Sequence, residues 1–154
     1  MVESGDGAYR VRPSTTVNDL GLAKEVLFEG GLTLVAAKDG KLLFKSNSHG
    51  VTDLLTMIDH LGESTEGASL ADSVVGRAAA LLCVYSRVIA VFGERMSEGA
   101  VSVLKANGIW YEFGTLVPGI LNREKNDICP FDKAVAGTED PTAALERLKS
   151  VRLA

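Results

Sequence analysis

Four residues in the middle of the chain, Asp72, Ser73, Gly76 and Arg77, combine groups that suit anion binding. They lie at the predicted start of a helix, where the first backbone N–H groups lack partners and the helix dipole is positive, so an anion binds readily. Ser73 can add a hydroxyl donor, and Arg77 can reach a phosphate or carboxylate with two hydrogen bonds. Gly76 would let a ligand approach the backbone. The group predicts a site for a small anionic metabolite, phosphorylated or nucleotide-like.

The same residues also allow a structural interpretation. Asp72 and Ser69 would then cap the helix, and Gly76 would serve packing. Arg77 would pair with a carboxylate, because an arginine in an otherwise apolar helix needs a partner. Both interpretations stay open at this stage. Further candidate ligand contacts, in the polar segment that follows Pro118, are Asn122 and Arg123.

Cys129 is the candidate catalytic residue, because it lies in an irregular polar segment before a proline. A loop thiol beside a cleft can act as a nucleophile or redox group if a base or a positive field favours the thiolate. The flanking Asp127 and Asp132 would oppose this by raising the pKa of the thiol, and His49 or His60 would serve as the base only if the fold brings one near. A structural Cys-Pro turn is the competing interpretation.

The sequence predicts no metal site and no cofactor. The residues that most often bind transition metals are scattered, at His49, His60, Cys83 and Cys129. Their spacings match no zinc finger, zinc ribbon or metalloprotease helix. Cys83 lies in an apolar segment, where a cysteine is typically a small buried hydrophobic residue.

Length and composition indicate one globular domain. The chain has 154 residues, of which 46% are hydrophobic and 23% charged, and its formal charge is -4. That charge, with no basic cluster, argues against nucleic-acid binding. No signal peptide and no membrane span are expected, and two unpaired cysteines favour the cytoplasm. We expect a flexible arm over residues 1–16 and a single domain over 17–154.

Hydrophobic periodicity predicts the elements that would position these residues. Two apolar runs around Asp39-Gly40 predict a β-hairpin over 32–46. Strands over 88–92 and 109–113, joined by a helix, predict a parallel βαβ unit. The expected helices cover 18–28, 51–61, 69–85, 98–106 and 140–153, and the third is apolar nearly all round. The order implies an α/β fold, a three-layer α/β/α sandwich with a mixed sheet.

Several segments are similar to a small uncharacterised prokaryotic family, a domain of unknown function in the cytidine-deaminase-like superfamily. They are Asp72–Cys83, Asn126–Pro130, Gly31–Val35 and Leu116–Pro118. The resemblance covers about residues 18 to 150 and implies a cytidine-deaminase-like fold, but no established activity. Active deaminases hold zinc with a His-x-Glu arrangement at the start of the buried helix and a Pro-Cys-x-x-Cys pair at the next. The corresponding stretches, 73–77 and 96–100, contain neither histidine nor cysteine, so zinc-dependent deamination is not expected.

Three functions follow as hypotheses. The preferred one is metal-free binding of a small anionic ligand at the start of the helix predicted over 70–85. The alternatives are a metal-free enzyme that uses Cys129 and a non-catalytic assembly module. Self-association as a homodimer or higher oligomer is expected, because helices 51–61 and 140–153 both carry apolar stripes that one small sheet would leave partly exposed.

Overall fold

Six strands form one mixed sheet in the computed structural model, which describes residues 3–4, 14–48 and 50–153. The strand order is β1-β6-β5-β4-β2-β3, and β4, β5 and β6 run parallel while β2 is antiparallel to both its neighbours. The predicted mixed sheet and the parallel βαβ unit are therefore confirmed. The strands are β1 (Glu3–Ser4), β2 (Leu34–Lys38), β3 (Lys41–Ser46), β4 (Ser69–Val75), β5 (Ala90–Ser97) and β6 (Trp110–Val117).

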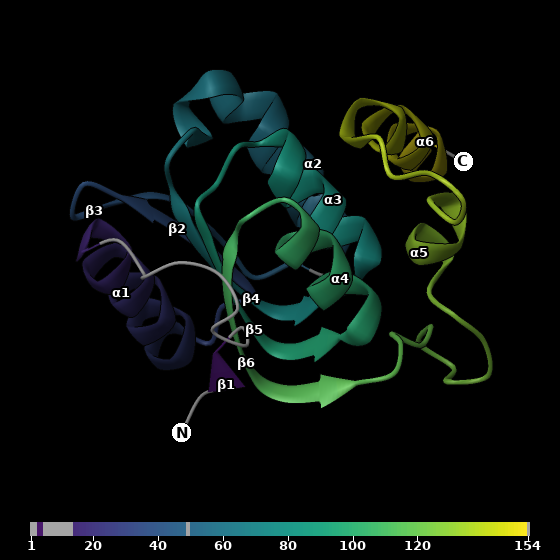
Figure 1. The fold of residues 1–154 in the computed structure, drawn as a ribbon, viewed down its shortest axis with the longest axis horizontal. Coiled ribbons are helices and arrows are strands. Elements are labelled where there is room, and N and C mark those ends of the chain that lie inside the picture. The colour runs from purple at the N-terminus through teal and green to yellow at the C-terminus, as the bar shows by residue number, and fades with distance from the viewer. Residues whose placement is uncertain (1–2, 5–13, 49, 154) are drawn as a thin grey trace.

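Helices cover both faces of this sheet (Figure 1). One face packs against α1 (Ser14–Gly30), and the other packs against α2 (Val51–Leu61), α3 (Arg77–Tyr85) and α4 (Glu98–Ala106). The three-layer α/β/α sandwich predicted from the sequence is confirmed. The remaining elements are the short 3-10 helix η1 (Gly62–Thr65) and the helices α5 (Pro130–Ala134) and α6 (Pro141–Leu153), of which α5 and α6 pack on the outer side of α3.

The position of α3 explains its composition. The helix lies between the sheet and α6, with α2 and α4 also in contact with it, so all of it except its ends is covered by protein. Residues 78–83 are all buried, and three of them are alanines that let neighbouring backbones approach closely. A helix that is apolar all round is stable only in such an interior position. Burial of α3 is what fixes both of its ends relative to the sheet.

The segment just before α3 is a strand and not part of a helix as predicted. Residues 69–75 form strand β4, although they were expected to begin the helix and to supply its capping box. The strand pairs with β2 on one side and β5 on the other, and this pairing outweighs the helical pattern of the isolated segment. The helix begins only at Arg77, with Gly76 as its N-cap. Asp72 and Ser73 are therefore strand residues.

The first helix also begins earlier than predicted. Asp19 lies inside α1, and its carboxylate accepts the backbone N–H groups of Asp39 and Gly40 at 3.0 and 2.9 Å. Both of these residues have positive φ, 53° and 78°, as a tight hairpin turn requires. Asp19 thus stabilises the β2–β3 turn. Ser97 and Asp140 cap the helices that follow them, because their side chains accept the N–H groups of residues 100 and 143.

The apolar stripes expected to drive self-association are covered within one chain. Leu54 and Leu55 of α2 and Leu145 and Leu148 of α6 are all buried in the main core cluster. The stripe argument for a homodimer is therefore wrong, and self-association stays a prediction without it. Of the predicted arm over 1–16, residues 1–2 and 5–13 lie outside the described residues. In the described part of the chain, no helix has the length and hydropathy needed to span a membrane.

Candidate ligand-binding site

The first turn of α3 receives a carboxylate from the chain itself. The backbone N–H of Ala78 donates to Oδ1 of Asp132 at 2.8 Å. At Gly76, an added Cβ would lie 2.5 Å from Oδ2 of Asp132 and 2.9 Å from Ile120, so only glycine leaves room for this approach. Burial raises the pKa of Asp132, while the N–H groups of Ala78 and Arg77 and the Arg77 charge oppose the shift. Asp132 thus occupies the place that the sequence analysis assigned to an anionic ligand.

The guanidinium of Arg77 is bound to the same segment of chain. Its Nη1 donates to the backbone oxygen of Val135 and its Nη2 to that of Thr138, each at 2.6 Å. Arg147 of α6 donates to two more carbonyls of this segment, those of residues 134 and 136, at 3.4 and 3.3 Å. Arg77 has partners of the kind that the structural interpretation required, although they are carbonyls and not a carboxylate. It holds the link between α5 and α6 against α3.

Asp72 lies in a separate buried polar cluster. Only 7% of its surface is exposed, and its Oδ1 accepts the N–H of Val74 at 3.3 Å. Burial, reinforced by the negative charge of Asp53, raises the pKa of Asp72 to about 8. Burial and the neighbouring Asp72 likewise raise the pKa of the Cys83 thiol, which makes Cys83 an inert core residue.

Asp53 is held in this cluster by hydroxyl groups. The hydroxyls of Thr33 and Ser46 lie 2.9 and 2.8 Å from its two carboxylate oxygens. The backbone N–H of Ser73 donates to the carbonyl of Thr33 at 2.9 Å, so this serine serves sheet pairing at the point where β4 leaves β2. The arrangement joins α2 to the sheet and leaves Asp72 and Ser73 away from the first turn of α3.

The polar segment before α5 forms a turn closed by its own side chains. Nδ2 of Asn122 donates to Oδ1 of Asn126 at 2.9 Å, and Arg123 is exposed without a hydrogen bond or ion pair to any described residue. Cys129 is half-buried, and its backbone N–H donates to the carbonyl of Ile120 at 2.9 Å. His49 lies outside the described residues, and no hydrogen bond between Cys129 and a described histidine is found. The structure therefore brings together Gly76, Arg77 and the Cys129 segment, but not Asp72, Ser73 or Arg123.

The residues at the two helix starts do not fit zinc. The starts of α3 and α4 are adjacent, since a Cβ on Gly99 would lie 3.6 Å from Cβ of Arg77. Neither helix start has a thiol or imidazole ligand. Within residues 3–4, 14–48 and 50–153, no group of three or more His, Cys, Asp or Glu side chains is placed to hold a metal ion. No step of zinc chemistry can be assigned to these positions.

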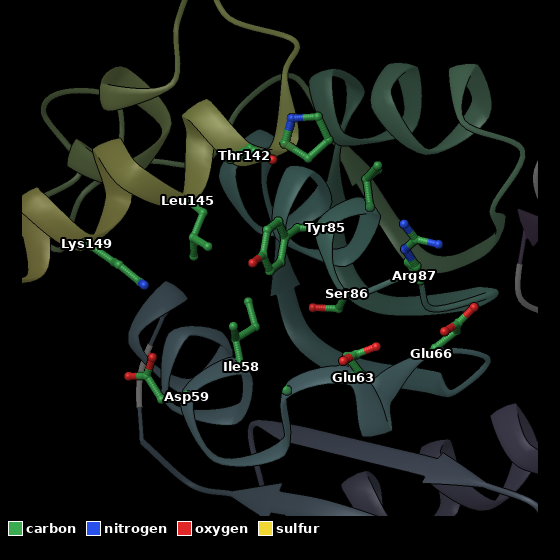
Figure 2. Close-up of a pocket in the computed structure, with 13 residues that line it drawn as sticks. Ile58, Asp59, Glu63, Glu66, Tyr85, Ser86, Arg87, Thr142, Leu145 and Lys149 are labelled. Atoms are coloured by element: carbon green, nitrogen blue, oxygen red, sulfur yellow. The ribbon is translucent and has the colours of Figure 1, made fainter.

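A cavity of about 760 Å³ opens at the other end of α3 (Figure 2). It lies between the carboxyl ends of α2 and α3, η1, and the first three turns of α6. Its size is that of a pocket for a small organic molecule. The lining residues are Ile58, Asp59, Gly62, Glu63, Glu66, Val84, Tyr85, Ser86, Arg87, Pro141, Thr142, Leu145 and Lys149.

The middle of this cavity is apolar and contains one hydroxyl without a partner. Tyr85 is 39% exposed, and its ring lies beside the side chains of Ile58 and Leu145 (Figure 2). The Oγ of Ser86 is buried and finds no hydrogen-bond partner in the described part of the chain. Buried hydroxyls are normally satisfied, and exceptions often mark a place where water or a ligand binds.

Charged side chains lie on both sides of the Tyr85 ring. Asp59 and Lys149 lie on one side, and Glu63, Glu66 and Arg87 lie on the other (Figure 2). Asp59 is paired with Arg152 of α6 at 3.1 Å. Among the described residues, the other four charges have no ion-pair partner. The cavity therefore combines an apolar centre with uncompensated charge at its ends.

This cavity could not be predicted from the sequence because its walls come from three distant segments, around residues 58–66, 84–87 and 141–149. No local spacing connects them. The one available signal was Tyr85-Ser86-Arg87, where a large amphipathic ring and two polar residues end a helix that is otherwise buried. Asp132 was considered only for its effect on Cys129, and nothing in the sequence indicated its contact with Ala78.

Residues 22–151 match the family model TM1506, described as a domain of unknown function (DUF1893). The crystal structure of a DUF1893 family protein (TM1506) from Thermotoga maritima superposes with a TM-score of 0.79 at 22% identity, covering 96% of this chain and 97% of that one. No curated protein matches the sequence.

Two weaker structural likenesses were also found. RibD from Acinetobacter baumannii has a TM-score of 0.47 at 19% identity, covering 62% of this chain and 34% of that one. The dCMP deaminase of cyanophage S-TIM5 has a TM-score of 0.44 at 15% identity, covering 70% and 100%. Likenesses at these scores carry no conclusion about the fold or the activity of this chain.

Proposed function

The chain belongs to the DUF1893 family, a domain of unknown function, and we propose that it binds a small organic molecule in the cavity between α2, α3 and α6, without a metal. The observation that supports this most is the composition of the cavity wall. An exposed tyrosine and unpaired charges surround about 760 Å³ of open space, and the wall behind them contains a buried serine hydroxyl without a partner among the described residues. Ligand sites typically combine an apolar lining with a few convergent polar groups in this way.

Binding at the start of α3, which the sequence favoured, is less supported. A ligand anion there would have to displace Asp132 from the N–H of Ala78. It would also have to draw Arg77 away from the carbonyls of Val135 and Thr138. Because Asp132 is tethered to the site by the chain, its effective concentration there is high, and a free anion competes poorly with it. Anion binding at that place remains a weaker proposal.

The proposal is tested with phenol, a neutral ring that needs only the apolar part of the cavity. In two-dimensional ¹H–¹⁵N NMR spectra, millimolar phenol is expected to shift the amide signals of Tyr85, Arg87 and Leu145. Thr142 is exposed and lines the cavity, so Thr142→Trp fills the opening without disturbing the core and should abolish these shifts.

Thr115→Trp is the matched control, because it adds the same bulk at an exposed position of β6 outside the cavity. This variant should bind phenol as the parent protein does. The proposal is wrong if phenol leaves the cavity amides unshifted, or if Thr142→Trp and Thr115→Trp bind it equally.

A further inference from the structure

The charges around the cavity are distributed unevenly, and we infer from this that the ligand is a zwitterion with its anionic and cationic groups at opposite ends of a flat apolar body. The inference rests on the proposed function, since it concerns the ligand of the same cavity. It adds a chemical class: an amine or similar cation at one end, and a carboxylate or phosphate at the other.

One end of the cavity is positive. Asp59 is neutralised by Arg152 at 3.1 Å. Lys149 lies one turn before Arg152 on α6, so the same ion pair places it beside this end of the cavity. Its ammonium group has no ion-pair partner among the residues that the structure describes. A ligand carboxylate or phosphate would supply an ion-pair partner for Lys149.

The other end is negative. The N–H of Gly67 donates to the backbone oxygen of Arg87 at 2.9 Å, which places Glu66 beside Arg87. The hydroxyl of Thr65 donates to the backbone oxygen of Ser86 at 3.0 Å, which fixes η1, and with it Glu63, against the same turn. Two carboxylates and one guanidinium leave a net charge of -1 there. A ligand ammonium group suits this end, and an anion would meet repulsion from both glutamates.

The space between the two ends selects an apolar body. The Tyr85 ring, Ile58 and Leu145 separate the charged groups, so a molecule that reaches both ends must cover these side chains (Figure 2). A flat ring can stack on Tyr85, and aromatic pairs of this kind are stabilising beyond the area they bury. A compact zwitterion such as glycine would reach only one end and lose this contact.

The probe is 4-(aminomethyl)benzoate, which carries an ammonium group and a carboxylate on opposite sides of a benzene ring. Benzoate and benzylamine are its matched controls, since each lacks one of the two charges. Partly exposed ion pairs are weak, so we expect benzoate and benzylamine each to bind about threefold more tightly than phenol. We expect 4-(aminomethyl)benzoate, which carries both charges, to bind about tenfold more tightly than phenol. The affinities are measured by NMR titration of the cavity amides.

Two variants test which charged group of the ligand lies at which end of the cavity, and a third is their control. Lys149→Met should reduce the affinity for 4-(aminomethyl)benzoate to that for benzylamine. The double variant Glu63→Gln/Glu66→Gln should reduce it to that for benzoate. Lys45→Met, at an exposed position of β3 outside the cavity, should change nothing.

The outcomes separate the inference from the proposed function. If phenol binds in the cavity but benzoate binds as tightly as 4-(aminomethyl)benzoate, the zwitterion is wrong and the cavity remains the binding site. If phenol does not bind in the cavity, the proposed function is wrong, and the inference about its ligand is wrong as well. If the zwitterion binds best and Lys149→Met has no effect, the assignment of the ends is overturned.

Discussion

Replacing Asp72 with asparagine should remove most of the pH dependence of stability at neutral pH. The carboxyl group is buried in β4 beside Asp53 and Cys83, and its pKa is about 8 in the folded protein against 3.8 as the ordinary value. Between these values the unfolded chain has lost the proton and the folded chain has kept it. The free energy of unfolding therefore falls as pH rises through this window, because the folded state binds more protons.

The size of the effect follows from one proton. Stability contributed by Asp72 is lost at about 1.4 kcal/mol per pH unit, so about 3 kcal/mol disappears between about pH 5 and pH 7. Asp72→Asn has no ionisation at this position and keeps a neutral group of the same shape. The difference in unfolding free energy, variant minus parent, should be near zero at about pH 4 and should grow by about 3 kcal/mol from pH 5 to pH 7.

Urea unfolding followed by circular dichroism at a series of pH values measures this difference. An unchanged dependence of the unfolding free energy on urea concentration shows that the variant keeps the fold. Parallel pH profiles for the two proteins over this range would be incompatible with a protonated Asp72 in the folded protein. They would mean that Asp72 is ionised in the folded state and is compensated in a way that the structure does not show.

Four other predictions concern the cavity and the start of α3. Ser86→Ala should leave the stability unchanged or slightly higher, because the Oγ lost has no partner, and it should weaken the binding of 4-(aminomethyl)benzoate. Ser69→Ala also removes a buried hydroxyl without a partner among the described residues, and it should change neither stability nor binding. A clear loss of stability in Ser86→Ala or Ser69→Ala would contradict this prediction. Gly76→Ala should lower the unfolding free energy by about 2 kcal/mol, because the added methyl group pushes Asp132 away from the N–H of Ala78. Asp132→Ala should then cause little further loss of unfolding free energy in the Gly76→Ala background. Additive losses in chemical denaturation would count against the contact. Arg77→Met should cost about 3 kcal/mol in the same assay by losing two hydrogen bonds of a charged group, whereas unchanged stability would restore Arg77 as a candidate ligand contact. Elemental analysis of the purified protein should find no stoichiometric zinc, and a zinc ion bound tightly to each chain through mild chelation would overturn the absence of a metal site.

The sequence predicted the fold where local patterns and tertiary packing agree. The hairpin around Asp39-Gly40 has a backbone requirement that few other residues meet, and α4 has a clear cap at Ser97. Strand β4 was missed because Ser69-x-x-Asp72 imitates a capping box and runs directly into an apolar helix. Only the pairing of this segment with β2 and β5 distinguishes strand from helix, and that pairing is long-range.

The candidate site was harder to predict than the fold for the same reason. The sequence identified the start of α3 at Gly76-Arg77 as a place for an anion, and a carboxyl group does lie there. It is Asp132, more than fifty positions further along the chain. The cavity depends on the distance between α2 and α6, which is set by how both helices pack on α3. Such a space has no signature in any single segment.

The most direct test is a crystal structure of the protein soaked with 4-(aminomethyl)benzoate. We expect the ring on the face of Tyr85, the carboxylate toward Lys149 and the ammonium group toward Glu63 and Glu66, with Asp132 still bound to the N–H of Ala78. If the molecule is bound instead at the start of α3, with Asp132 displaced and the carboxylate of the molecule on Arg77, the cavity is not the ligand site.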